Sequence, residues 1–294
     1  YKDVFLYQGT YEQFLDTMIA VSVIPNHHFN ANALHDFLFA QPMSERDSWW
    51  SFSYLTDRLS WSSSVKRLID WSWNIEDRSH VLDESIVLAS ITLSWFLCSS
   101  NRELRDYSTK ALVSLLQYRL HLVIDLLKKF EEINDPYIYD RLFAVAYGSS
   151  LRAENTEGLV GLSEYIFRTI FKTEKEVYPH ILLRDYARGV IEYASYLGKS
   201  LSFDVSEVRP PYKSEFPQKE LSNDEIDKRY KIEYDSEEYK PYHRGQNAIL
   251  GSMTTEYGRG IGGYGDFGRY TFQSALDSWN VDYNGLSNKA VEWI

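Results

Sequence analysis

Glycines and an aspartate towards the C-terminal end of the chain have a spacing that could bind a nucleotide. Gly258, Gly260 and Gly263 match G-x-G-x-x-G, which in dinucleotide-binding folds lets backbone amides approach a pyrophosphate. That chemistry needs a buried strand before the first glycine and a helix after the last, and this sequence indicates neither. Asp266 begins an Asp-Phe-Gly triplet, but the other kinase motifs are missing. We therefore predict no nucleotide and no other cofactor at these residues.

Three histidines in the first part of the chain raise the question of a metal site. His27 and His28 precede His35, which is followed by Asp36. A zinc-type site needs four converging ligands, or three and a water, and no cysteine or second histidine cluster completes this set. We interpret these residues as a polar loop that flanks a helix, and we predict no metal site.

The nucleophilic residues lack the patterns that activate them. No serine lies in a G-x-S-x-G sequence, and Cys98 lies in an apolar stretch that does not favour a thiolate. His121 and His180 fall within helical patterns, where packing or surface roles are more common than general-base catalysis. The sequence therefore predicts no catalytic residue.

Composition excludes several classes of partner. The 294 residues are 44% hydrophobic and 16% aromatic, which is enough to bury a sizeable core. A net charge of -11 disfavours nucleic acid, because affinity for phosphates comes mainly from clustered lysine and arginine. No uncharged apolar run reaches the roughly 18 residues of a membrane span. A single cysteine cannot form an internal disulfide, so we expect a cytoplasmic location. The first residue, Tyr1, and the unfinished helix at the end suggest a piece of a longer polypeptide.

Helical periodicity dominates the first two thirds of the chain. From Thr10 to about Leu201, apolar residues recur at helical spacing with few glycines or prolines between them. We predict an all-α fold of about ten helices with short connections. The predicted N-caps of the first three helices are Thr10, Asn30 or Asn32, and Ser44 with Asp47 three residues later, an acidic relative of the capping box.

Three of the predicted helices share a pattern. Aligned on Arg105, Arg141 and Arg184, they are 36 and 43 residues apart, near the roughly 40-residue period of a repeated helix pair. Small residues then coincide at Ser108, Ala144 and Ala187, and the last apolar position falls at Leu115, Leu151 and Ala194. A single helix pair cannot bury its apolar side alone, so we predict antiparallel pairs stacked in series as an α-solenoid.

The segment NRELRDYSTKALVSLL, 101–116, carries a resemblance to a known class of repeat. Through Asn101, Leu104, Arg105, Ser108 and Ala111 it resembles the second helix of HEAT and armadillo-like repeats. The resemblance covers residues 79–201 best. It implies a stack of helix pairs with an extended surface for protein recognition.

The last third of the chain differs in composition. We predict a helical repeat domain at 1–201 and a second region at 202–294, in which an irregular, tyrosine-rich segment, a glycine-rich loop and closing helices pack on the repeats. Within this region, 223–232 is predicted to be helical. Aromatic and arginine side chains favour contact with a partner. The predicted partner-binding residues of the glycine-rich loop are Tyr257, Arg259, Tyr264, Phe267 and Arg269.

Several stretches together resemble the helical region of large bacterial STAND or NACHT-type NTPases of the antiviral class. They are IPNHHFNANALHDFLFAQPMSERDSWWS, DPYIYDRLFAVAYG, LLRDYARGVIEYA, RPPYKSEFP and YGDFGRYTFQSAL. The resemblance implies a region that follows an ATPase core in a cytoplasmic protein, which senses a phage component and then oligomerises. The chain has no G-x-x-x-x-G-K-[ST] P-loop of its own.

We therefore expect a non-catalytic helical scaffold or sensor region that binds protein, either a phage protein or another part of the same chain, with any oligomer formed through the parent protein. One alternative is a hydrolase or transferase with a site under the tyrosine-rich segment, using Asp266, Arg259 and His243. Another is a freestanding adaptor.

Overall fold

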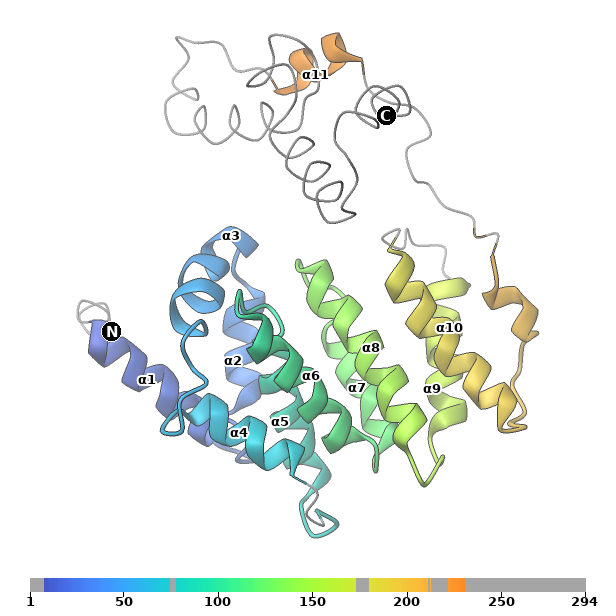
Figure 1. Ribbon diagram of the computed structural model, residues 1–294, viewed down its shortest axis with the longest axis horizontal. Coiled ribbons are helices and arrows are strands. Elements are labelled where there is room, and N and C mark those ends of the chain that lie inside the picture. The colour runs from blue at the N-terminus through green and yellow to red at the C-terminus, as the bar shows by residue number, and fades with distance from the viewer. Residues whose placement is uncertain (1–7, 75–77, 173–179, 211, 213–221, 231–294) are drawn as a thin grey trace, which may run out of the picture. The chain divides into compact units, whose positions relative to one another are not determined.

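The computed structural model describes residues 8–74, 78–172, 180–210, 212 and 222–230 (Figure 1). These residues belong to two compact units, the first extending to residue 216 and the second beginning at residue 217. All regular elements in these described ranges are helical, and the ranges contain no strand, so the predicted all-α class is confirmed.

The first unit contains ten α-helices and three short helices of other types within its described residues. The α-helices are α1 (Gln8–Val21), α2 (Ala31–Phe39), α3 (Met43–Arg46), α4 (Ser64–Trp73), α5 (Asp83–Phe96), α6 (Arg102–Leu116), α7 (Leu120–Lys129), α8 (Pro136–Arg152), α9 (Leu159–Ile166) and α10 (Ile181–Tyr196). The others are the π-helices η2 (Asp47–Tyr54) and η3 (Phe167–Phe171) and the 3₁₀-helix η4 (Val205–Val208).

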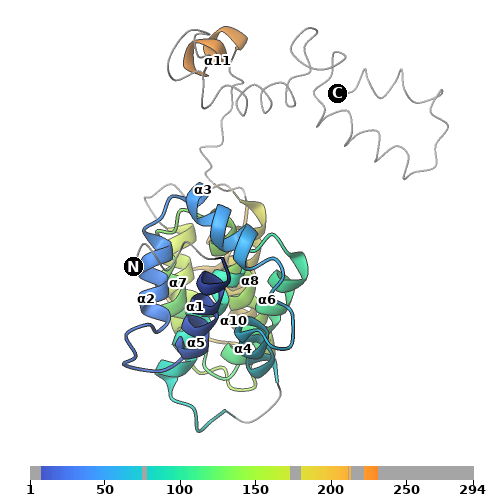
Figure 2. The same cartoon turned by 90° about the vertical axis from the view of Figure 1, so that its left-hand side faces the viewer.

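The α-helices of the first unit lie in two rows. In one row, α4, α6, α8 and α10 pack side by side in that order, and α1 packs on α4. The other row consists of α2, α5, α7 and α9 (Figure 1). Figure 2 looks along the rows and separates α2, α5 and α7 from α4, α6 and α8. Contacts between α5 and α6, α7 and α8, and α9 and α10 join the rows.

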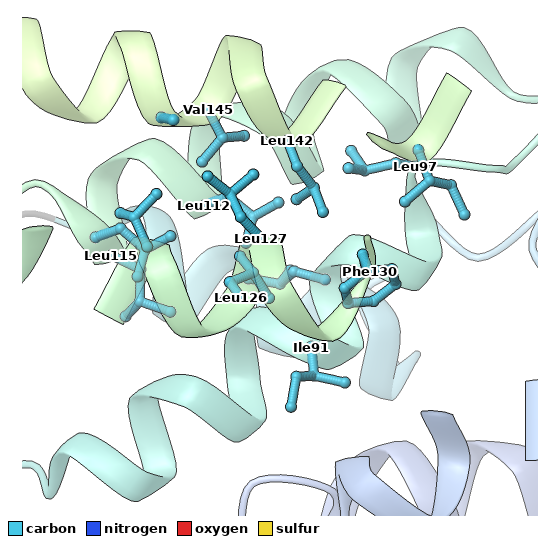
Figure 3. Packing of buried hydrophobic residues seen from close by; sticks show 14 of the residues in the cluster. Ile91, Leu97, Leu112, Leu115, Leu126, Leu127, Phe130, Leu142 and Val145 are labelled. Carbon is cyan, nitrogen blue, oxygen red and sulfur yellow. The ribbon is translucent and has the colours of Figure 1, made fainter. Parts of the chain in front are cut away.

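Leucine-rich packing between the rows forms the core. Figure 3 shows Leu112 of α6, Leu127 of α7 and Leu142 of α8 meeting there, and each is almost completely buried. Fully burying such a side chain contributes roughly 1.5–3 kcal/mol, so the shared core stabilises all three helices.

Helix α5 is buried on most of its surface, which explains its uncharged sequence after the first turn. Its hydroxyl groups donate to carbonyls one turn earlier: Ser90 to Ile86 at 2.8 Å and Ser94 to Ser90 at 2.7 Å. The polar side chains are thus satisfied within their own helix. None of the helices in the described part of the chain has the length and apolar character needed to cross a membrane.

The N-caps set the register of the row helices α6, α8 and α10. The side chains of Asn101, Asp135 and His180 accept hydrogen bonds from backbone N–H groups of the first turn, at 2.9, 3.2 and 3.4 Å. Counted from these caps, the buried positions coincide. They are Leu104, Ser108, Ala111, Leu112 and Leu115 in α6; Ile138, Leu142, Val145, Ala146 and Ser149 in α8; and Leu183, Ala187, Val190, Ile191 and Ala194 in α10.

This register corrects the predicted alignment of α8 by two residues. Arg105 and Arg184 are equivalent, as predicted, but their counterpart in α8 is Tyr139 and not Arg141. The side chain of Leu151, predicted to match buried Leu115, is 46% exposed. Arg141 was a misleading marker for the alignment. The N-cap and the buried positions fix how a helix is rotated against its neighbours, and a surface charge does not.

Two of the predicted helix starts also differ from the structure. Helix α1 begins at Gln8, before the predicted cap Thr10. Helix α3 has Pro42 at its N-cap without a side-chain hydrogen bond, so Ser44 lies inside the helix and does not cap it. The prediction at α2 is confirmed at Asn30, whose side chain accepts from the backbone N–H of Asn32 at 3.0 Å.

Helix α10 is the last helix of this row among the described residues, and its flank away from α8 is charged. Thr109 and Val113 of α6 face α8, and the equivalent α10 positions, counted from the caps, are Arg188 and Glu192. Arg209 donates to Glu192 at 2.8 Å.

Residues 202–210 and 212 belong to the first unit. The backbone N–H and hydroxyl of Ser202 each donate to the Glu164 carboxylate at 2.7 Å. The ring of Phe203 stacks on Phe167 with 3.7 Å between centroids, and Val208 is completely buried.

In the second unit, the structure describes α11 (Asn223–Tyr230), which begins where the sequence predicted a helix. Ser222 and Glu225 form a capping box. The Glu225 backbone N–H donates to the Ser222 hydroxyl at 3.3 Å, and the Ser222 backbone N–H donates to the Glu225 carboxylate at 2.9 Å.

The close contact between α8 and α10 gives a first testable prediction. A Cβ atom on Gly189 would lie 2.7 Å from the Tyr147 ring. Gly189→Val should lower the free energy of unfolding by about 1–3 kcal/mol in urea titrations, because the added methyl groups force the ring aside.

The control for this prediction is Gly161→Ala. Its Cβ would approach no closer than 3.7 Å to Ile124, so alanine should be neutral or stabilising by up to about 1 kcal/mol. Combining Gly189→Val with Tyr147→Ala should give less destabilisation than the sum of the single changes. If the two changes in free energy of unfolding were strictly additive, the result would contradict the contact between Gly189 and Tyr147.

Candidate interaction surface

The solvent-facing side of the row α4, α6, α8 and α10, which we call the α4–α10 face, combines aromatic and charged side chains. Its helices are drawn side by side in Figure 1. Residues six positions after the N-caps, Tyr107, Arg141 and Tyr186, lie on this side and are partly exposed. The face is defined by Lys66, Trp73, Arg105, Tyr107, Lys110, Tyr137, Arg141, Tyr147, Arg184 and Tyr186.

An aromatic pair with a lysine joins α4 to α6 on this face. The rings of Trp73 and Tyr107 have centroids 5.4 Å apart, and Lys110 Nζ lies 5.2 Å from the first and 5.8 Å from the second. The Tyr107 hydroxyl donates to the Glu103 carboxylate at 2.6 Å, which raises the pKa of Tyr107. Trp73 is 39% exposed, so a ring that could be covered by a partner remains accessible to solvent.

Arginines link α6 to α8. Arg141 of α8 donates to Asp106 at 3.2 Å and to the Thr109 hydroxyl at 2.8 Å. The guanidinium groups of Arg105 and Arg141 lie 5.7 and 6.0 Å from the Tyr137 ring. Because cation–π contacts of this kind restrict both partners, the tyrosine is held in place while 43% of it stays exposed.

The two rows differ in charge. The formal charges of α4, α6, α8 and α10 are +1, +1, +1 and 0, whereas those of α2, α5, α7 and α9 are -1, -2, +1 and -1. The row that carries the aromatic residues is therefore net positive in a chain whose net charge is -11.

A buried arginine connects the first helices to the start of α8. Arg46 is completely buried, and its guanidinium donates to Asn134 at 2.6 Å and to Asp135 at 3.4 Å. Burial raises the pKa of Asp135, although Arg46 opposes the shift. Asp135 also caps α8, so this ion pair fixes the position of α3 relative to α8.

Cys98 lies beside this ion pair and is a protonated thiol at neutral pH. Ser51 donates to its sulfur at 3.2 Å, and the thiol reaches the carbonyl of Trp95 at 3.1 Å. Burial raises the pKa of Cys98 to about 12, which does not suit a nucleophile.

The histidines do not converge. His35 is buried within α2, not in a polar flanking loop as we predicted, and its Nδ1 accepts from the Trp95 indole N–H at 3.2 Å. His27 accepts from the backbone N–H of Phe29 at 3.1 Å, away from His35. In the described ranges, no group of three histidine, cysteine, aspartate or glutamate side chains could hold a metal ion.

The residues predicted to bind a partner or to form an alternative active site lie outside the described residues. They are Tyr257, Arg259, Tyr264, Phe267 and Arg269, with Asp266 and His243. Sequence reasoning missed the α4–α10 face, although a signal was present. Tyr107 and Tyr186 occupy the same position after their N-caps, and the alignment on Arg105 and Arg184 already matched them.

Comparisons with known proteins found no matching family model, no similar curated protein and no similar solved structure.

Buried His35 predicts how stability depends on pH. Burial lowers its pKa from 6.5 to about 4, so the folded state holds the neutral imidazole. The unfolded chain binds the proton first as the pH falls, and the stabilisation present above pH 6.5 is lost towards pH 4. The loss amounts to about 3 kcal/mol for this group.

His35→Gln retains an acceptor for Trp95 but does not titrate. Between pH 7 and pH 4.5, the free energy of unfolding of the His35→Gln variant, measured in urea, should fall less than that of the wild type. His28→Gln, at an exposed position, should keep the wild-type loss. Equal losses in all three proteins would show that His35 is not the group responsible.

Proposed function

We propose that this chain is a non-catalytic helical-repeat scaffold that binds protein through its α4–α10 face. The single observation that carries the proposal is the set of partly exposed tyrosine and tryptophan rings between cations on one row of helices. Tyrosine, tryptophan and arginine are the residues that most often dominate binding energy at protein interfaces. The row provides a broad surface, as stacked repeats do.

The recurrence of caps and buried positions supports an α-solenoid of HEAT or armadillo-like helix pairs as the finer description. The pairs α5 with α6, α7 with α8, and α9 with α10 each combine one helix of either row. Such pairs bury their apolar sides only by stacking, which accounts for the shared core.

The proposed setting is a large cytoplasmic STAND or NACHT-type NTPase of antiviral defence. It rests on the resemblance of the sequence stretches alone. In that setting the partner is a phage protein or another part of the same polypeptide, and oligomers form through the parent protein. A P-loop encoded upstream in the same gene would support this setting, and turnover of a substrate by the isolated chain would count against the non-catalytic role.

Site-specific photo-crosslinking tests the binding surface. With benzoylphenylalanine at Tyr107 or Tyr186, cells that express the full chain should yield a discrete protein adduct, which mass spectrometry identifies. The same group at Tyr118, which is 53% exposed but outside the face, should not yield it. The proposal fails if the three positions give the same adducts.

The identified protein, once purified, allows a quantitative test. Trp73→Ala and Tyr107→Ala should each weaken its binding by about 30-fold, because loss of a central aromatic anchor costs about 2 kcal/mol. Tyr118→Ala should change the Kd by less than about twofold. Calorimetry measures the Kd, and circular dichroism confirms that each variant is folded.

A further inference from the structure

The contacts on the α4–α10 face leave its cations less neutralised than its carboxylates. Lys110 contacts two aromatic rings. Arg105 contacts one aromatic ring and donates to the carbonyls of Ser99 and Ser100. Arg184 contacts the Tyr212 ring. Within the described residues, none of these three cations has a carboxylate within ion-pair distance.

The carboxylates of α6 and α10 on the same side are already engaged. Arg141 pairs with Asp106, whereas Glu103, which accepts from the neutral Tyr107 hydroxyl, keeps its negative charge. On α10, Arg188 pairs with Asp185 and Arg209 pairs with Glu192. Lys110, Arg105 and Arg184 therefore outnumber the one carboxylate, Glu103, that keeps its charge on this side.

On the basis of the proposed function, we propose that the α4–α10 face binds an extended acidic segment of a protein, whose carboxylates pair with Lys110 and Arg184 and whose apolar residues cover the exposed rings between them. The net positive charge of this row in an acidic chain provides the complementarity. Opposite charge accelerates encounter and selects against basic partners.

The spacing of the helices sets the length of the segment. Neighbouring packed helices lie about 8–10 Å apart, so the two steps from α6 to α10 span roughly 16–20 Å. An extended peptide advances about 3.3 Å per residue. A segment of about six to eight residues can therefore reach from Lys110 to Arg184 across Tyr147.

The same face is poorly suited to nucleic acid. Glu103 keeps its negative charge beside Tyr107 and would repel a regular series of phosphates. A peptide can place its carboxylates selectively opposite the unneutralised cations, whereas a phosphate backbone cannot.

Fluorescence anisotropy with labelled probes tests the inference on the full chain. The probes are an eight-residue peptide of alternating glutamate and tyrosine, the same peptide with lysine in place of glutamate, and an eight-nucleotide oligothymidylate. At 50 mM salt, the glutamate peptide should bind with a Kd below about 1 mM and more weakly at 300 mM. The lysine peptide and the oligothymidylate should bind at least about tenfold more weakly.

Charge reversal identifies the surface. Lys110→Glu with Arg184→Glu should weaken binding of the glutamate peptide by at least about tenfold, because two attractions become repulsions. The matched control, Lys128→Glu with Arg168→Glu, makes the same change of net charge on α7 and η3 and should leave the Kd within about twofold.

Three outcomes would overturn the inference: no binding of the glutamate peptide, equal weakening by the two double variants, or preferential binding of the oligothymidylate. The proposed function is judged separately by crosslinking. A non-acidic protein captured at Tyr107 would preserve the binding surface and refute only the acidic segment.

Discussion

The arrangement of the first unit depends on the close approach of α6, α8 and α10. Gly148 faces Val113 across the first contact and Gly189 faces Tyr147 across the second, where a Cβ would lie 2.9 and 2.7 Å from the opposing side chain. This proximity brings Arg141 within reach of Asp106, and it places aromatic side chains of neighbouring helices on one side. The proposed binding surface is therefore a product of backbone spacing.

Buried polar groups tie the first helices to this row. Arg46 must be paired because an isolated buried charge is strongly destabilising, and its partners come from the residues that begin α8. Nearby, the Trp95 indole N–H donates to His35 Nδ1, so both buried groups have a hydrogen-bond partner. Such groups fix which helices meet, since an apolar contact alone would tolerate several registers.

Charge and aromatic content act together in the proposed function. Salt bridges within the row neutralise most carboxylates, while cations stacked on rings keep their charge available. Exposed rings add apolar contact area, and neighbouring cations add selectivity for the sign of the partner. The opposite row has a net negative formal charge and would not attract the same partner.

The sequence by itself determined the helical class and the starts of α2 and α11, because periodicity and an N-cap such as Asn30 act within a few residues. It did not determine the register of α8, the burial of His35 or the composition of the α4–α10 face. Those depend on which helices become neighbours, and that choice arises from packing between residues distant in the chain. A side chain's local pattern shows that it lies on a helix, but only its tertiary neighbours decide whether it is covered.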